Sequence, residues 1–268
     1  MRKRIILDVD TGTDDAVALM VAALSPALEL VGATTVNGNV PVAYCTDNTL
    51  RVFDYIGVDV PVFEGMSQAL LRPDFDRGDW PVSLELPPAR SRKQPQHAVD
   101  WLIETYLASD GDITLVPVGP LTNVALAIRR EPRILPKIPE LVIMGGGHAL
   151  GNMTPSAEFN IWVDPEAARV VLNCGRPIRL LPLDATHKAL VSTAEVERLR
   201  ALGTPAGEAA AICIGPRIEM YDSGQPMQRP GTTPVHDALA VCAIIDPTVI
   251  TTSFINVDVE TRGELTTG

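Results

Sequence analysis

Short runs of apolar residues alternate along the chain with segments of helical periodicity. The first run, RIILDV at 4–9, is followed by the helical pattern DDAVALMVAALS at 14–25. Runs that are apolar throughout are typical of strands buried on both faces, and strands of this kind separated by helices form mainly parallel sheets. The alternation therefore predicts an α/β fold, an open Rossmann-like sheet with helices on both faces.

The same alternation continues to the end of the chain. Strands are expected at 4–9, 28–36, 60–63, 113–119, 140–147 and 177–184. Helices are expected at 14–25, 42–57, 96–109, 121–130, 165–175, 193–202, 205–220 and 236–245. The stretch 70–96 is rich in proline and charge, which predicts a long surface loop. Because no repeat or linker interrupts the pattern, we expect residues 1–268 to form one domain.

The charge balance restricts the partners of the chain. It carries 33 acidic against 22 basic residues, a net charge of −11, which disfavours binding to nucleic acid or to an anionic membrane. No stretch approaches the roughly 20 apolar residues of a membrane span, and the N-terminal apolar run is too short for a signal peptide. We therefore expect a cytoplasmic protein. Four widely spaced cysteines are expected to be reduced core residues: Cys45, Cys174, Cys213 and Cys242.

An acidic cluster follows the first expected strand. The stretch ILDVDTGTDD at 6–15 contains Asp8, Asp10, Asp14 and Asp15 and no lysine or arginine. Ligands of open parallel sheets bind beyond the carboxyl ends of the strands, so these side chains stand where a site is expected. Several carboxylates in one crevice need a counter-charge to stay ionised. The sequence therefore predicts a hard, oxygen-liganded cation, Ca²⁺ or Mg²⁺.

Three other interpretations of this cluster compete with a cation site. Asp14 can cap the following helix, which explains one or two of the aspartates but not four. An EF-hand loop is excluded, because its twelfth position would be Leu19 instead of glutamate. The motif LDVDTGT also resembles the DxDxT signature of haloacid-dehalogenase-type phosphatases, which stays an alternative although the later lysine and second acidic motif are not found.

Two further pairs of polar residues can serve a site. Glu158 and Asn160 lie two positions apart ahead of an expected helix, and in an extended segment they would face the same side and suit vicinal hydroxyls. His236 and Asp237 open another expected helix. They are either a helix cap or, beside a cation, an extra ligand and a proton donor, because an imidazole titrates near neutrality.

Taken together, the motifs form the pattern of a known family. In chain order they are DVDTGTDDAVAL, TTVNGN, VPVGPLTN, MGGG, GN, AEFN, DPEAA and VHDALA. The chain resembles the inosine–uridine-preferring nucleoside hydrolases over essentially its whole length. This resemblance implies hydrolysis of the N-glycosidic bond of a ribonucleoside to ribose and free base, a role in nucleoside salvage, and a homodimer or homotetramer.

The resemblance also implies roles for individual residues. The implied Ca²⁺ ligands are Asp10, Asp15, the backbone carbonyl of Val118, and Asp237. The residues implied to bind the nucleoside through its ribose are Asp14, Asn39, Asn152, Glu158 and Asn160. Asp10 would act as the general base and His236 would help the departing base, whereas Asp8 is given a structural role.

The sequence departs from the family pattern in three places: the loop after the third strand, the Pro- and Gly-rich segment before His236, and the C-terminal end. Family members carry a histidine that covers the base in the loop after the third strand, but DFDRGDWPVSLELPP at 74–88 contains none. Arg77, Asp79 or Trp80 are the candidates to replace it, and Tyr221 aligns with a base-facing tyrosine. A non-catalytic nucleoside-binding homologue is therefore an alternative function. Family chains continue beyond the final RGELTTG, so their C-terminal strand and helix are expected to be absent from 1–268.

Overall fold

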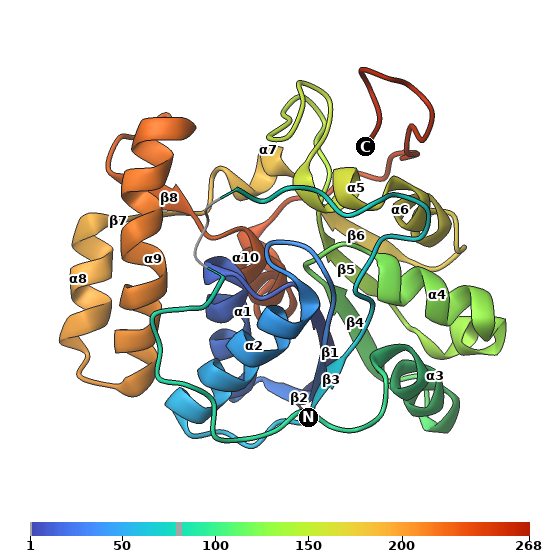
Figure 1. Ribbon diagram of the computed structural model, residues 1–268, viewed down its shortest axis with the longest axis horizontal. Helices are drawn as coiled ribbons and strands as arrows, with labels where there is room; N and C mark the ends of the chain where they lie inside the picture. The colour runs from blue at the N-terminus through green and yellow to red at the C-terminus, as the bar shows by residue number, and fades with distance from the viewer. Residues whose placement is uncertain (1, 79–81) are drawn as a thin grey trace.

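The computed structural model describes residues 2–78 and 82–268 (Figure 1). Six parallel strands form one sheet in the order β3-β2-β1-β4-β5-β6. The strands are β1 (Lys3–Val9), β2 (Leu28–Thr35), β3 (Val62–Glu64), β4 (Ile113–Pro117), β5 (Leu141–Met144) and β6 (Ile178–Leu181). This confirms the predicted open, mainly parallel sheet. The order reverses between β1 and β4, which is the switch point of a Rossmann-like sheet.

Helices cover both faces of this sheet (Figure 1). One face carries α1 (Thr13–Leu24), α2 (Val42–Ile56), α9 (Pro205–Gly224) and α10 (His236–Ile245), and the other carries α3 (Ala98–Ala108), α4 (Thr122–Arg130) and α6 (Pro165–Leu172). Along β1, Leu7 and Val9 point into the first apolar core and Ile6 into the second. Because successive side chains of a strand face opposite sides, a strand buried on both faces must be apolar throughout.

The long loop after β3 is confirmed, but it is anchored to the core. No helix or strand occurs in its described parts, 70–78 and 82–96. Leu84 and Leu86 are nevertheless buried, and their carbonyls accept hydrogen bonds from Arg51 of α2 at 3.4 and 3.0 Å. The side chain of Asn48 accepts a further bond from the backbone of Leu84. The loop therefore lies along α2, at one side of the carboxyl ends of the strands.

The structure also contains short elements that the pattern did not predict. They are α5 (Phe159–Val163), α7 (Leu183–Thr186), the 3₁₀ helices Pro132–Lys137 and Pro247–Val249, and an antiparallel pair of strands, β7 (Leu190–Ser192) and β8 (Thr232–Pro234). Each is too short to show a period. Helix α8 (Thr193–Ala201) agrees with expectation, whereas α9 runs four residues beyond the predicted end. Strand β8 leads directly into α10.

Two expectations about the whole chain can be compared with the structure. In residues 2–78 and 82–268, every helix is too short or too polar to cross a membrane. All four cysteines are free thiols, as predicted. Only Cys45 and Cys213 are fully buried, whereas Cys174 and Cys242 are half-buried.

Candidate active site

A pocket of about 600 Å³ opens at the carboxyl ends of β1 and β4. Asp10 follows β1 and Val118 follows β4, and the backbone amide of Val118 donates to the carbonyl of Asp8 at 2.8 Å. This bond extends the pairing of the two strands to the point where their chains diverge. The pocket therefore lies where ligands bind in open α/β sheets.

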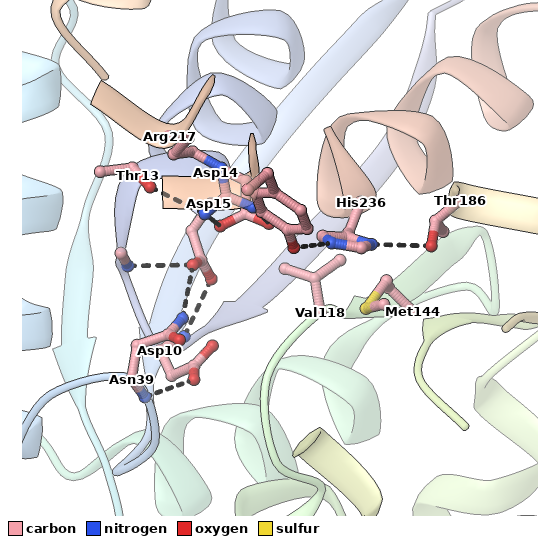
Figure 2. A network of polar contacts seen from close by, with 12 residues as sticks. Asp10, Thr13, Asp14, Asp15, Asn39, Val118, Met144, Thr186, Arg217 and His236 are labelled. Carbon is pink, nitrogen blue, oxygen red and sulfur yellow. Dashed lines mark hydrogen bonds and ion pairs between the residues drawn. The ribbon is translucent and has the colours of Figure 1, made fainter. Parts of the chain in front are cut away.

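Asp14 and Asp237 line this pocket, and the carboxylates of Asp10 and Asp15 lie next to them. Asp10, Asp15 and Asp237 are at most 3% exposed, and Asp14 is 7% exposed. Asp14, Asp15 and Asp237 can each place one carboxylate oxygen within 4.8 Å of the others. The backbone amides of Asp10 and Gly12 donate to the carboxylate of Asp15 at 3.2 and 2.9 Å, which fixes its orientation (Figure 2). Asp15 and Asp237, which are 222 positions apart in the sequence, thus belong to one anionic centre.

Asp10 is enclosed by backbone. Its Oδ2 accepts the amide of Asn39 at 2.7 Å, whereas its buried Oδ1 has no partner within the described residues. A Cβ at Gly38 would lie 2.1 Å from Oδ2, and a Cβ at Gly119 would lie 2.8 Å from Oδ1. Glycine is therefore needed at both positions for close approach. The unpartnered Oδ1 is an acceptor that the protein leaves free for a ligand.

The electrostatics of the cluster call for a cation. Burial and the neighbouring Asp15 raise the pKa of Asp10 well above its ordinary value. Burial and Asp14 raise the pKa of Asp15 to about 6, and the same two causes raise that of Asp237. A bound divalent cation would favour the ionised forms. Because all the donors are oxygens, these residues fit a hard ion such as Ca²⁺.

Arg217 is a member of the site that sequence reasoning missed. This residue of α9 donates to both carboxylate oxygens of Asp14, at 3.1 and 3.2 Å, and to Oγ1 of Thr13 at 2.9 Å (Figure 2). The stretch 6–15 itself contains no basic residue, but the fold brings this guanidinium to Asp14. No local signal marks Arg217, because its partner is 203 positions away.

The predicted ribose-binding residues all line the pocket with Asp14. Asn39 donates through Nδ2 to Asp15 at 3.1 Å, and Asn152 accepts the amide of Phe159 at 2.9 Å. Asn160 donates through Nδ2 to the carbonyl of Val118 at 2.8 Å. A carbonyl oxygen has two lone pairs, so this bond leaves one for a cation.

The expectation of an extended segment at Glu158 and Asn160 was wrong. Glu158 is the N-cap of α5 and accepts the amides of Ile161 and Gly146 at 3.2 and 2.9 Å, whereas Asn160 lies in the first turn. A cap and a first-turn residue still present both side chains to the same pocket. Burial raises the pKa of Glu158 to about 7.

His236 begins α10 between two hydroxyl groups. Its Nε2 lies 2.8 Å from Oη of Tyr221, and its Nδ1 lies 2.7 Å from Oγ1 of Thr186 (Figure 2). Burial lowers the pKa of His236 to about 3, so the imidazole is neutral at pH 7. The expectation that it titrates near neutrality was wrong, because that value belongs to a solvated ring. Thr186 was missed, since α7 has no recognisable motif.

The loop after β3 forms the wall opposite α9. Phe75 and Arg77 line the pocket, and the Arg77 guanidinium lies 4.2 Å from the centre of the Phe75 ring. Arg77 donates to the carbonyl of Gly38 at 2.8 Å and to Oδ1 of Asn37 at 3.1 Å. It therefore anchors the loop instead of standing free to replace a histidine. The other two candidates, Asp79 and Trp80, lie outside the described residues.

Asp8 lies apart from this pocket. It is fully buried, and its Oδ1 accepts Oγ1 of Thr34 at 2.6 Å and Nδ2 of Asn123 at 2.8 Å, whereas its Oδ2 has no partner among the described residues. These bonds connect β1 with β2 and α4. A carboxylate enclosed in this way is not placed for attack on a phosphate.

Comparisons with known proteins agree with the geometry. Residues 5–268 match the family described as inosine-uridine preferring nucleoside hydrolase. A pyrimidine-specific ribonucleoside hydrolase RihB of Escherichia coli (strain SE11) is 41% identical over 264 residues, which cover 97% of this chain and 83% of the relative. RihB of Escherichia coli O157:H7 is 42% identical over 267 residues, with the same coverage.

Solved structures give the same result. A purine-preferring ribonucleoside hydrolase from Gardnerella vaginalis superposes with a TM-score of 0.90 and is 34% identical, covering 98% of this chain and 86% of its own. An inosine-guanosine nucleoside hydrolase superposes with a TM-score of 0.88 at 29% identity, covering 100% and 86% of the two chains. The fold and the sequence therefore agree on one family.

Proposed function

Because this chain belongs to the inosine-uridine preferring nucleoside hydrolase family, we propose that it hydrolyses ribonucleosides by a Ca²⁺-dependent attack of water on C1′. The chain is an N-glycosidase of ribonucleosides, as its relatives are. The metal, the general base and the residue roles are our proposals. The observation that supports them best is the buried, unpartnered Oδ1 of Asp10. Asp10 neighbours Asp15, which can place a carboxylate oxygen within 4.8 Å of Asp14 and Asp237.

Asp10, Asp15, Asp237 and the carbonyl of Val118 would hold the cation. When bound, Ca²⁺ would act as a Lewis acid, orienting the ribose diol and lowering the pKa of a coordinated water. This donor set contains only hard oxygen ligands, and burial raises the pKa of each of its three carboxyl groups. A cation would therefore stabilise the ionised cluster as well as assist the reaction.

The remaining pocket side chains would orient the ribose. Asp14 and Glu158 offer acceptors for hydroxyl groups, and amide side chains offer both donors and acceptors. The amides are those of Asn39, Asn152 and Asn160. Holding the sugar in one orientation removes much of the entropic barrier to attack on C1′.

Asp10 would take the proton of the attacking water. As the C1′–N bond lengthens, the ribose gains oxocarbenium character, and the surrounding carboxylates stabilise this positive charge. Oδ1 of Asp10 has no partner among the described residues, so it is free to accept a proton. The departing base gains negative charge at the same time and needs a hydrogen-bond donor.

Tyr221 and His236 are the proposed donors to the base. Burial raises the pKa of Tyr221 to about 12, so its hydroxyl keeps its proton at pH 7. The Tyr221 hydroxyl lies 2.8 Å from Nε2 of His236, and both residues line the pocket. His236 would then act through this hydrogen bond and not as a free imidazolium. General-acid assistance of this kind is worth roughly 10²–10⁴-fold.

A panel of purine and pyrimidine ribonucleosides tests the proposal. Release of reducing sugar is measured with metal-stripped protein, with and without added Ca²⁺. We expect turnover only with Ca²⁺, and pyrimidine nucleosides are tested first because the RihB relatives are named for them. Binding without turnover would favour the non-catalytic alternative. Turnover at the full rate in chelator would contradict the calcium proposal. Salvage, a cytoplasmic location and a homodimer or homotetramer stay predictions.

A further inference from the structure

Arg217 and Asp14 form a charge pair at the edge of the proposed metal site. Their side chains are 12% and 10% exposed, and they join α9 to α1 across the pocket. The guanidinium contacts both oxygens of the Asp14 carboxylate, and Oγ1 of Thr13 accepts a third bond. Nε of Arg217 is buried and has no partner among the described residues. The position of the guanidinium is therefore set by Asp14 and Thr13.

The Arg217–Asp14 pair is not expected to add much to the free energy of unfolding. Two buried charges lose their hydration, and their attraction often only balances that loss. The unpartnered Nε of Arg217 adds the cost of a buried donor without an acceptor. The location of the pair therefore suggests a role in the site, where Asp14 has two competing uses.

The competition concerns the cation. By distance, Asp14 belongs with Asp15 and Asp237, since the three can place oxygens within 4.8 Å of one another. A metal that recruited Asp14 would turn its carboxylate toward the ion and take acceptor sites that a hydroxyl group of the sugar could use. Arg217 satisfies both oxygens of Asp14 and lowers the net negative charge of the cluster. Arginine stays protonated at all relevant pH values, so this effect is permanent.

We propose that Arg217 is a positioning residue that keeps Asp14 out of the cation's ligand set and holds it in place for the ribose. This inference rests on the proposed function, because it assumes that the site holds both a cation and a ribose. It makes two linked predictions of opposite sign. Loss of Arg217 should tighten cation binding and weaken nucleoside binding.

Calcium titration calorimetry on metal-stripped protein tests the first prediction without any activity. Arg217→Met removes the guanidinium but keeps an unbranched side chain of similar length. We expect its Kd for Ca²⁺ to fall about tenfold or more, since one positive charge is lost and one carboxylate is released. The matched control is Arg179→Met, because Arg179 also holds a carboxylate with two bonds, that of Glu140, but outside the pocket. Its Kd should equal that of the wild type.

Kinetics test the second prediction. KM for the best nucleoside should rise about tenfold in Arg217→Met, with a smaller change in kcat, because ground-state binding is affected most. Arg217→Lys keeps the charge but cannot contact both oxygens in a fixed fork, so its KM should lie between those of the wild type and Arg217→Met. Circular dichroism establishes that each variant is folded, and Arg217→Lys carries the test if Arg217→Met does not fold.

A double-mutant comparison separates this proposal from a simple charge effect. In an Asp14→Asn background, Arg217→Met should no longer tighten Ca²⁺ binding about tenfold, because no carboxylate is released. A full gain in that background, or unchanged Ca²⁺ binding in folded Arg217→Met, would overturn the inference. Wild-type protein that binds Ca²⁺ but hydrolyses no nucleoside would instead contradict the proposed function, and the calorimetric test of Arg217 would still stand.

Discussion

Oη of Tyr221 lies 2.8 Å from Nε2 of His236, which couples the last part of α9 to the first residue of α10. The imidazole is also bound at Nδ1 by Thr186, so both ring nitrogens are occupied by hydroxyl groups. Burial lowers the pKa of His236 to about 3 and raises that of Tyr221 to about 12. At pH 7 both groups are therefore neutral, and the phenol can donate to a ligand when Nε2 of His236 carries the hydrogen of their shared bond.

Tyr221→Phe tests this assignment. The substitution removes the hydroxyl but keeps the ring, so the helix packing is retained. We expect kcat on natural nucleosides to fall about 10²-fold, within the usual range for the loss of an acid catalyst. On p-nitrophenyl riboside, whose leaving group needs no protonation, the loss should be under about threefold. Equal losses on both substrates would argue that Tyr221 acts on the ribose or the fold instead.

Asp10→Asn tests the proposed general base. The amide oxygen can still accept the backbone N–H of Asn39, so the local geometry should be kept. We expect kcat to fall at least about 10³-fold, because the variant loses both the base and one ligand charge. Asp8→Asn is the matched control, since Asp8 is also buried, lies two residues earlier in β1, and has a side chain that accepts hydrogen bonds from Thr34 and Asn123. Turnover of Asp10→Asn near that of the control would remove Asp10 from the mechanism.

The ionisation of Glu158 is expected to lower the free energy of unfolding as the pH rises. Burial raises its pKa from 4.5 to about 7 in the folded chain. The folded state therefore binds a proton more tightly than the unfolded state does. The stability contributed by that proton is fully present below about pH 4.5 and is lost as the pH rises through 7. The loss amounts to at most about 1.4 kcal/mol per pH unit in that window.

Glu158→Gln removes this dependence, because an amide does not ionise and can still accept the two backbone amides. Free energies of unfolding are measured by denaturant titration at pH 5 and pH 8, in chelator for both proteins. We expect the free energy of unfolding of Glu158→Gln, relative to that of the wild type, to be larger at pH 8 than at pH 5. Glu104→Gln, at an exposed position of α3, should show no such gain. A constant difference at both pH values would contradict the raised pKa.

The sheet and its helices could be predicted because their signals are local. Apolar runs such as that of β1 are long enough to show that both faces are buried, and the carboxyl-end rule then places Asp10 and Asp15 at one edge. The contacts that complete the site are not local. Arg217 reaches Asp14 only because α9 packs on α1, and Thr186 reaches His236 only because α7 ends beside α10. No periodicity encodes such pairings.

The burial and backbone conformation of individual site residues also could not be predicted from the sequence. The ordinary pKa of histidine suggested an acid at His236, but burial reverses that inference. In the same way, the spacing of Glu158 and Asn160 suggested an extended segment, whereas a five-residue helix with Glu158 as its N-cap brings both side chains to the pocket. The sequence thus indicated which polar residues line the pocket, but it did not indicate the protonation of His236 or the backbone conformation at Asn160.

Arg77→Met tests how the loop after β3 shapes the pocket. Arg77 ties Phe75 to the backbone of Gly38, and Gly38 packs against Asp10. Loss of these bonds should let the loop segment around Phe75 move and hold the nucleoside less firmly. We therefore expect KM to rise about five- to tenfold with a smaller change in kcat. Arg72→Met is the control, because Arg72 lies in the same loop but bonds Glu166 outside the pocket. Its KM should stay within about twofold of the wild type. If both variants raise KM equally, the effect comes from general loosening of the loop, and Arg77 has no specific part in forming the site.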